Sequence, residues 1–270
     1  MNGWKHFAWA LLASPLTLFG GGEMGMQPCP LSAKETLYVT ETTAGDKMLA
    51  IDGKVIAEGE APRLSYSGKH VQFLVGGLLP EVRIYAVETR RIESPEEPIC
   101  PDREAMWANG SLLVWQDGGA THAYDVAKRT RAEFPQLLPD TLAISPDGKT
   151  AVRAVADADG TPALELYEIA GGKAVRRIAS QSGWRGAASG GAHSPVFSRD
   201  GDYLAWVDAG IQPLADIRVM NLKRGEEKAV TIDGRDHQFP AFVPDQSPAE
   251  LIFSTLGNTA TTLQRATLDP

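Results

Sequence analysis

Short apolar runs alternate with polar turns along most of this chain, and one unit of this pattern recurs several times. Each copy has a short apolar run, a tight turn of small and polar residues, and a second, longer apolar run. The copies occupy residues 64–75, 142–155, 195–207 and 240–254, with a weaker one at 106–118. Runs of this length that are rich in Val, Leu, Trp and Phe and bounded by turn residues predict paired β-strands.

The turn inside each copy has the residue types that a tight hairpin requires. The clearest copy reads Ser-Pro-Asp-Gly at residues 145–148, and residues 200–201 repeat the Asp-Gly pair. Proline fixes φ, aspartate accepts hydrogen bonds from nearby backbone amides, and glycine takes the positive φ that closes the turn. The turn chemistry therefore supports a hairpin at each copy.

A second hairpin with a charged turn follows four of the copies, at residues 82–94, 121–134, 164–178 and 217–232. The glycines of successive first turns are 42, 38 and 53 residues apart. Four short strands in a unit of roughly 40–45 residues are typical of a β-propeller blade. Apart from the N-terminal segment, no stretch has the 3.6-residue period of a helix. The prediction is an all-β fold.

The Ser-Pro-Asp-Gly turn between a short and a longer apolar strand resembles the repeats of the TolB-family propellers. The clearest copies are residues 145–149 and 197–201, and the resemblance covers residues 37–268. It implies four-stranded antiparallel blades; we expect six of them, with five as the alternative. A related repeat occurs in the propellers of prolyl-oligopeptidase-like enzymes, so the repeat identifies the architecture rather than an activity.

The N-terminal segment has the three parts of a secretory signal peptide. Lys5 precedes a short apolar run that Pro15 interrupts, and small residues follow at Gly20–Gly22. The run is too short for a stable membrane span. We therefore expect a signal peptide at residues 1–22, a connector at 23–36 and a propeller domain at 37–270, in a periplasmic or secreted protein. The small domain that precedes the propeller in TolB has no counterpart in this arrangement.

The charge of the chain limits the classes of partner, and its cysteines offer one possible disulfide. The chain has 26 Lys and Arg against 34 Asp and Glu, a formal charge of −8. Nucleic-acid binding needs a basic surface, so we expect no nucleic-acid partner. Cys29 and Cys100 are the two cysteines. In an oxidising compartment they could form one disulfide, which would stabilise the fold by roughly 2–4 kcal/mol; two unpaired thiols are the alternative.

Candidate chemistry is sparse. None of the five histidines has a metal-ligand spacing, so we expect no catalytic centre, metal or cofactor. His193, Asp236 and His237 come just before inferred innermost strands, where the loops of a propeller surround the mouth of its channel. Trp184 and Arg185 lie in a glycine-rich insertion at residues 180–191, and such a pair is typical of binding hot spots. The alternatives are a solvated rim for the histidines and burial against a neighbouring blade for Trp184.

Three functions fit this sequence. The first is an exported binding module that uses one propeller face for a protein or peptide partner in the cell envelope. The second is a ligand- or metal-dependent enzyme with its site at the channel mouth. The third is a structural accessory subunit of an envelope complex. Fold alone does not separate them, because propellers support all three; the absence of a catalytic motif favours the first.

Overall fold

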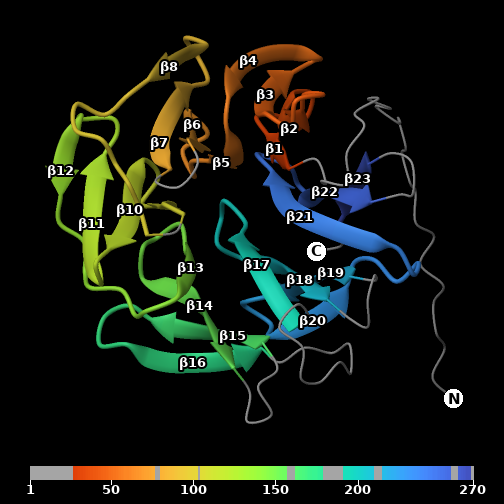
Figure 1. The fold of residues 1–270 in the computed structure, drawn as a ribbon. Helices are drawn as coiled ribbons and strands as arrows, with labels where there is room; N and C mark the ends of the chain where they lie inside the picture. Colours follow the sequence, from red (N-terminus) through yellow and green to blue (C-terminus); the bar gives the residue numbers. More distant parts are fainter. Residues whose placement is uncertain are drawn as a thin grey trace, which may run out of the picture.

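A computed structural model describes residues 27–76, 80–102, 104–156, 162–178, 191–209, 215–256 and 261–268. In this part of the chain the backbone forms 23 strands and no helix, which confirms the all-β prediction. Consequently, no helix able to cross a membrane occurs among these residues. The predicted signal peptide at residues 1–22 lies outside the described residues. The sheets are arranged around a central axis like the blades of a propeller (Figure 1).

Four sheets have four strands each. Within each of these sheets, consecutive strands along the chain pair antiparallel. The first two sheets contain β1 (Pro28–Pro30), β2 (Thr36–Glu41), β3 (Lys47–Ile51), β4 (Lys54–Glu58), β5 (Glu60–Leu64), β6 (His70–Val75), β7 (Glu81–Ala86) and β8 (Arg91–Glu93). The next two contain β9 (Met106–Ala108), β10 (Leu112–Asp117), β11 (Ala120–Asp125), β12 (Thr130–Ala132), β13 (Thr141–Ile144), β14 (Thr150–Ala156), β15 (Pro162–Glu168) and β16 (Lys173–Ile178).

The last sheet has seven strands and consists of two meanders. Its strands are β17 (Gly191–Phe197), β18 (Tyr203–Ala209), β19 (Ala215–Asn221), β20 (Glu226–Ala229), β21 (Asp236–Val243), β22 (Glu250–Leu256) and β23 (Thr261–Thr267). A single parallel pair, Ala215 with Asp236, joins the meander β17–β20 to the meander β21–β23. The predicted hairpins are thus confirmed at the strands expected, and the number of blades stays a prediction.

The Ser-Pro-Asp-Gly turn has the hydrogen bonds that its sequence predicts. Ser145 Oγ donates to Asp147 Oδ1 at 2.7 Å, and the backbone amide of Lys149 donates to the same oxygen at 3.1 Å. The amide of Thr150 donates to Ser145 Oγ at 3.0 Å. Gly148 has a φ of 69°, a conformation that costs other residues about 1–2 kcal/mol. Ser145, Asp147 and Gly148 therefore each contribute to closing the turn.

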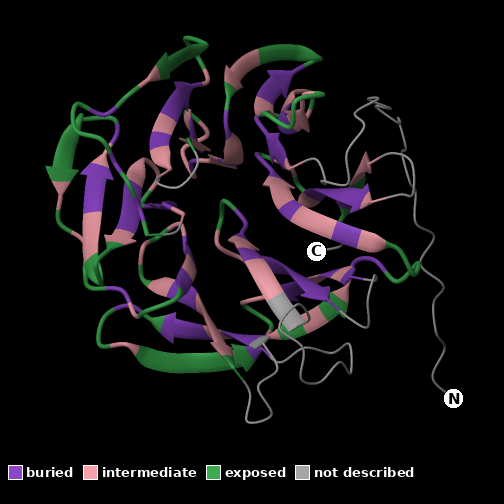
Figure 2. Cartoon of the chain, in the orientation of Figure 1, coloured by how far each residue is buried: buried purple, intermediate pink, exposed green. Residues whose placement is uncertain are grey.

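The core lies between neighbouring sheets, and the outermost strands are exposed (Figure 2). Trp206 on β18 and Leu164 on β15 belong to one buried cluster that joins two sheets. The ring closes in the same way, because Leu263 on β23 packs against Tyr38 and Ala50 of the first sheet. The described strands of the first and last meanders do not pair with one another, so packing between faces and a hydrogen bond from Arg265 to the carbonyl oxygen of Ala33 hold the two together.

The first sheet begins earlier than the sequence predicts. Strand β1 lies within the expected connector, and its Cys29 pairs with Leu37 of β2. We expected no strand here because prolines flank this cysteine, and proline cannot donate a hydrogen bond to a ladder. Strand β1 is an innermost, edge strand, so its other side needs no ladder partner and tolerates both prolines.

Candidate binding site in the central cavity

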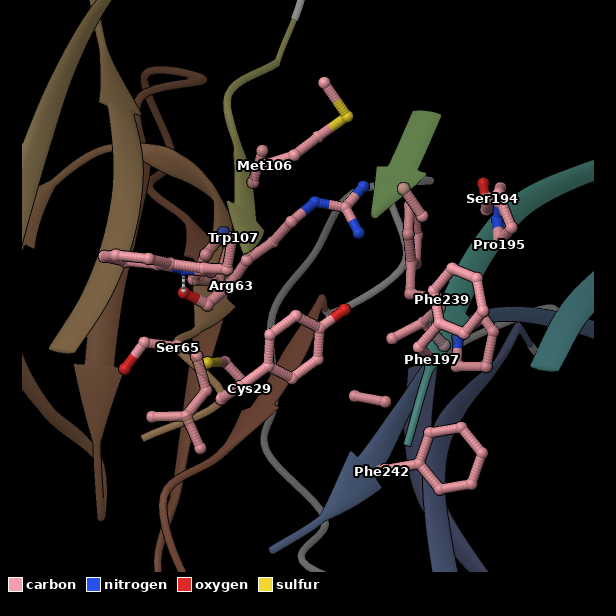
Figure 3. A pocket seen from close by; sticks show the side chains of 18 of the residues that line it. Cys29, Arg63, Ser65, Met106, Trp107, Ser194, Pro195, Phe197, Phe239 and Phe242 are labelled. Atoms are coloured by element: carbon pink, nitrogen blue, oxygen red, sulfur yellow. Dashed lines mark hydrogen bonds between the residues drawn. The ribbon is translucent and has the colours of Figure 1, made fainter. Parts of the chain in front are cut away.

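The innermost strands surround a cavity of about 180 Å³ on the ring axis (Figure 3). Its lining comes from β1, β5, β9, β13, β17 and β21, so every sheet contributes. The walls are mainly apolar and include Met106, Trp107, Phe197, Phe239 and Phe242. Cavities of this kind, apolar with a few polar groups, are the usual binding sites for small ligands and for inserted side chains.

Three of the innermost strands carry the same irregularity at the cavity wall. Ala61, Ser194 and Phe239 have φ values of 51°, 51° and 54°, and each precedes a proline. The pairing register shifts at each of these positions, as in a β-bulge. Bulges re-aim side chains and often occur beside functional sites, and a positive φ at a non-glycine residue is strained. The repeated bulge shapes the cavity lining.

An ion pair between two lining residues, Arg63 and Glu104, lies on the cavity wall. Both Arg63 Nε and Nη2 donate to Glu104 Oε2, at 2.9 and 2.5 Å. Glu104 raises the pKa of Arg63 above its ordinary value, although burial opposes this. The two side chains are 34% and 43% exposed, so solvent reaches them inside the ring. A bound group would meet this pair and, at the turn end, the guanidinium of Arg199.

The cavity is constricted at the end where the Ser-Pro-Asp-Gly turns lie. Tyr66 reaches across the ring and donates its hydroxyl to the carbonyl oxygen of Ile144 at 2.5 Å. Arg199 donates to Asp245 Oδ1 at 2.6 Å and to the carbonyl oxygen of Ser67 at 3.1 Å. Burial raises the pKa of Tyr66, which keeps its hydroxyl a donor. These side chains tie distant strands together beneath the cavity.

The predicted mouth residues lie at the opposite end, at the starts of the innermost strands whose ends lead into the turns. The sequence placed them just before these strands, but His193 is the third residue of β17, and Asp236 and His237 are the first two residues of β21. His193 comes directly before the bulge at Ser194 and bonds its Oγ through Nδ1 at 3.0 Å. Burial lowers the pKa of His193, and the nearby carboxylates of Asp208 and Asp236 only partly offset this. Asp236 on β21 is therefore close enough to His193 for its charge to act on the pKa of the imidazole. Trp184 and Arg185 lie outside the described residues.

His237 has different neighbours. Its side chain is 0% exposed; Nε2 lies 2.7 Å from Asp233 Oδ1 and Nδ1 lies 2.9 Å from Thr255 Oγ1. An ionised carboxylate only accepts, so Nε2 donates to Asp233, and Nδ1 shares a hydrogen bond with the hydroxyl of Thr255. Burial alone would raise the pKa of Asp233, but the hydrogen bond from His237 holds it below its usual value. His237 therefore positions β21 against β22 instead of facing a ligand directly.

This row of carboxylate, imidazole and hydroxyl has the residue types of an activated nucleophile. The hydroxyl belongs to Thr255, which is only 4% exposed, so a substrate cannot reach it in this conformation. No group of three or more His, Cys, Asp or Glu side chains suited to a metal ion occurs among the described residues.

The predicted disulfide is not present, and both cysteines are free. Cys29 is buried on the innermost strand β1 and lines the cavity, whereas Cys100 is exposed in the connection between β8 and β9. The prediction placed both residues in connectors, where a loop could bring them together. The strand β1 fixes Cys29 at the ring centre, so only one thiol is on the surface.

The two thiols are expected to differ in reactivity. Burial raises the pKa of Cys29 to about 12, and the thiolate is the reactive form. At pH 8, iodoacetamide is expected to modify Cys100 alone in the folded protein and both cysteines in urea. The intact mass before and after treatment measures this. Two modified thiols in the folded protein would show that the cavity around Cys29 opens readily.

Several lining residues were missed by sequence reasoning, among them Arg63, Glu104, Tyr66 and Arg199. The partners within each interaction are 41 to 132 residues apart, so no local pattern links them. One signal was available: a proline recurs shortly before the tight turn, at Pro62, Pro195 and Pro240. Each of these prolines directly follows the residue with positive φ in one of the three bulges.

No family model and no curated protein sequence matches this chain. Among solved structures, TolB from Acinetobacter baumannii superposes with a TM-score of 0.53 at 13% identity, covering 86% of this chain and 63% of that one. This chain thus spans less than two thirds of that TolB. A putative TolB from Agrobacterium tumefaciens gives 0.52 at 16% identity and 80% coverage of both chains.

Hydrazine synthase from Kuenenia stuttgartiensis gives a TM-score of 0.49 at 11% identity, covering 99% of this chain and 90% of that one. This likeness is too weak to carry an argument. The two TolB structures show the fold alone, since their sequences are so different. Together with the antiparallel sheets around one axis, they establish that this chain has a TolB-like β-propeller fold.

Proposed function

We propose that this chain is an exported binding module that holds a protein or peptide partner at the mouth of the central cavity, in the cell envelope. The observation that supports this is the cavity itself, which is lined by aromatic side chains, reached by solvent at Arg63 and Glu104, and constricted at the turn end. Such a cavity suits an anchoring side chain from a partner, which is the usual centre of a binding hot spot.

The proposed contact surface is the mouth. His193 and Asp236 supply polar contacts there, His237 positions the start of β21, and Trp184 and Arg185 lie in the segment that leads into β17. A signal peptide at residues 1–22 would direct the protein to the periplasm or the outside. Removing it would leave β1 in place, because that strand starts at Pro28.

The enzyme alternative has weaker support. A general base needs a free nitrogen within reach of the substrate, and both ring nitrogens of His237 are bonded within the protein. Within the described part of the chain, His193 has a hydrogen bond between Nδ1 and a serine hydroxyl, and the residues around it there form no metal site. Binding is therefore the function that the mouth supports best.

Two variants test this proposal independently. The double variant Trp184→Ala, Arg185→Ala removes the proposed hot spot, and Ala241→Trp fills the cavity from β21. We expect each to reduce the amount of specific partner recovered from an envelope extract at least tenfold, the effect of about 1.4 kcal/mol. Quantitative mass spectrometry of proteins retained by the immobilised chain measures the change.

Val175→Ala is the matched control, because Val175 is an exposed residue on the outermost strand β16. Circular dichroism and thermal melting would establish that each variant is folded. If both mouth variants retain the same proteins as the unmodified chain in equal amounts, the mouth is not the binding surface and the proposal is wrong.

A further inference from the structure

Strand β23 ends its meander one strand early. The meanders that precede it all finish with an outermost fourth strand: β4, β8, β12, β16 or β20. In the meander β21–β23, the third strand is the last, and no strand among the described residues pairs with the outer edge of β23. Figure 1 shows β23 at the outside of the ring, beyond β22.

The pairing register identifies the free backbone groups on this edge. β23 pairs antiparallel with β22 from Thr261 to Thr267, and the amide of Leu268 donates to the carbonyl of Ala249 just beyond the ladder. In an antiparallel ladder, hydrogen-bonded residues alternate with residues whose amide and carbonyl point away. The outward set is therefore Thr261, Leu263, Arg265 and Thr267. Among the described residues, no backbone hydrogen bond reaches the outward groups of these four residues.

Both faces of β23 make contacts with the rest of the protein. Leu263 packs against Tyr38 of the first sheet, and Arg265 Nη1 donates to the carbonyl oxygen of Ala33 at 2.8 Å. On the other face, Ala266 and Leu268 belong to the buried cluster that includes residues of β18 and β19. The edge is thus held in an extended conformation, ready for a further strand.

The composition of β23 differs from that of the other outer strands. Strands β4, β8, β12, β16 and β20 are three to six residues long, and each carries at least one charged side chain. β23 has seven residues, of which only Arg265 is charged. Proteins protect open edges from unwanted pairing by keeping them short and charged. β23 is longer than any of them and carries one charge in seven residues, so its edge is less protected, as expected for an edge that is covered in use.

We propose that the edge of β23 binds an extended segment of a protein partner, which adds to the sheet as its antiparallel fourth strand. Backbone hydrogen bonds to the outward set supply the affinity in this mode of recognition. The segment would need about seven residues, or roughly 23 Å of extended chain. This site is separate from the cavity mouth and does not depend on it.

Two other occupants fit less well. A second copy of the chain carries the same formal charge of −8, and like charges oppose association. The N-terminal segment would be long enough to form a strand beside β23 only before the signal peptide is cleaved. Cleavage after Gly22, which is part of the proposed function, leaves four residues before Gln27, about 13 Å of chain. A neutral or basic segment of another protein avoids the charge repulsion and can be long enough to pair along the whole of β23.

The test uses the mature chain and a displayed library of random dodecapeptides as the probe. We expect selected peptides to slow amide hydrogen exchange at Thr261, Leu263, Arg265 and Thr267. Arg265→Pro removes one outward amide without removing a bond to β22, since proline is tolerated at an open edge. It is expected to weaken those peptides at least tenfold. Arg265→Ala, which loses the same side chain but keeps the amide, is the matched control and should bind within twofold of the unmodified chain.

Each other result overturns the proposal. Peptides that bind Arg265→Pro and Arg265→Ala equally, or a library that yields none protecting β23, would show that the edge takes no strand. Peptides that protect only β17 and β21 would support the cavity mouth instead. Dimerisation that Arg265→Pro abolishes would identify a second copy as the occupant. Protection of β23 in the uncleaved chain alone would identify the N-terminal segment.

Discussion

Trp206→Ala is expected to lower the free energy of unfolding by about 3–5 kcal/mol, the usual loss for a large side chain removed from a core. Trp206 is 0% exposed and packs with Leu164 and Phe197 between two neighbouring sheets. Its removal leaves a void at the contact between these sheets, and the surrounding strands cannot close around it without losing their own pairing. Urea denaturation followed by fluorescence of the remaining tryptophans, or by circular dichroism, measures the loss.

Trp206→Phe is the matched control for this prediction. The indole Nε1 is buried and has no hydrogen-bond partner among the described residues, and an unsatisfied buried donor costs about 1–3 kcal/mol. Phenylalanine fills most of the space and removes that donor, so its expected loss is less than half that of alanine. Equal losses for the two variants would indicate that Nε1 has a partner, such as an internal water.

Gly59→Ala is expected to lower the free energy of unfolding by about 2–4 kcal/mol, from backbone strain and overpacking together. Gly59 lies between β4 and β5 with a φ of 153°. An added Cβ would lie 2.6 Å from Cδ2 of Phe73 and 2.9 Å from the carbonyl oxygen of Leu74. The first contact is with a buried ring and the second with the backbone of a central strand, so neither can move cheaply.

Gly53→Ala separates strain from crowding. Gly53 also has a positive φ, 78°, but an added Cβ there meets nothing within 4 Å. Only the backbone penalty of about 1–2 kcal/mol applies. The urea midpoint of Gly59→Ala should therefore fall clearly below that of Gly53→Ala. If the two midpoints coincide, β4 and β5 relax at Gly59 and crowding there contributes nothing.

The hairpins were predictable from sequence because each is encoded locally. In the turn that starts at Ser145, the residue types, the hydrogen bonds to Asp147 and the φ of Gly148 all lie within six residues. Strand β1 was not predictable in this way. Its prolines argue against a strand in isolation, and only the ring shows that one side of β1 needs no partner.

The candidate site depends on contacts between residues far apart in the sequence, which no local pattern predicts. The prediction placed His193 and His237 together at the mouth, from two loops that precede innermost strands. The structure brings His193 near Asp208 and Asp236 but buries His237 against Phe253 on β22. A difference of a few residues along a strand decides whether a side chain faces the axis or the neighbouring sheet, and the bulges at Ser194 and Phe239 change that alternation.

The hydrogen bonds of Tyr66 and Arg199 across the ring have a consequence for the order of events at the cavity. Because these side chains bridge the ring at the turn end, we expect an occupant that enters at the proposed mouth also to leave there. A small molecule bound deep in the cavity would be covered by any partner that arrives after it. It could dissociate only once that partner has left, so its release rate would report on the lifetime of the larger complex.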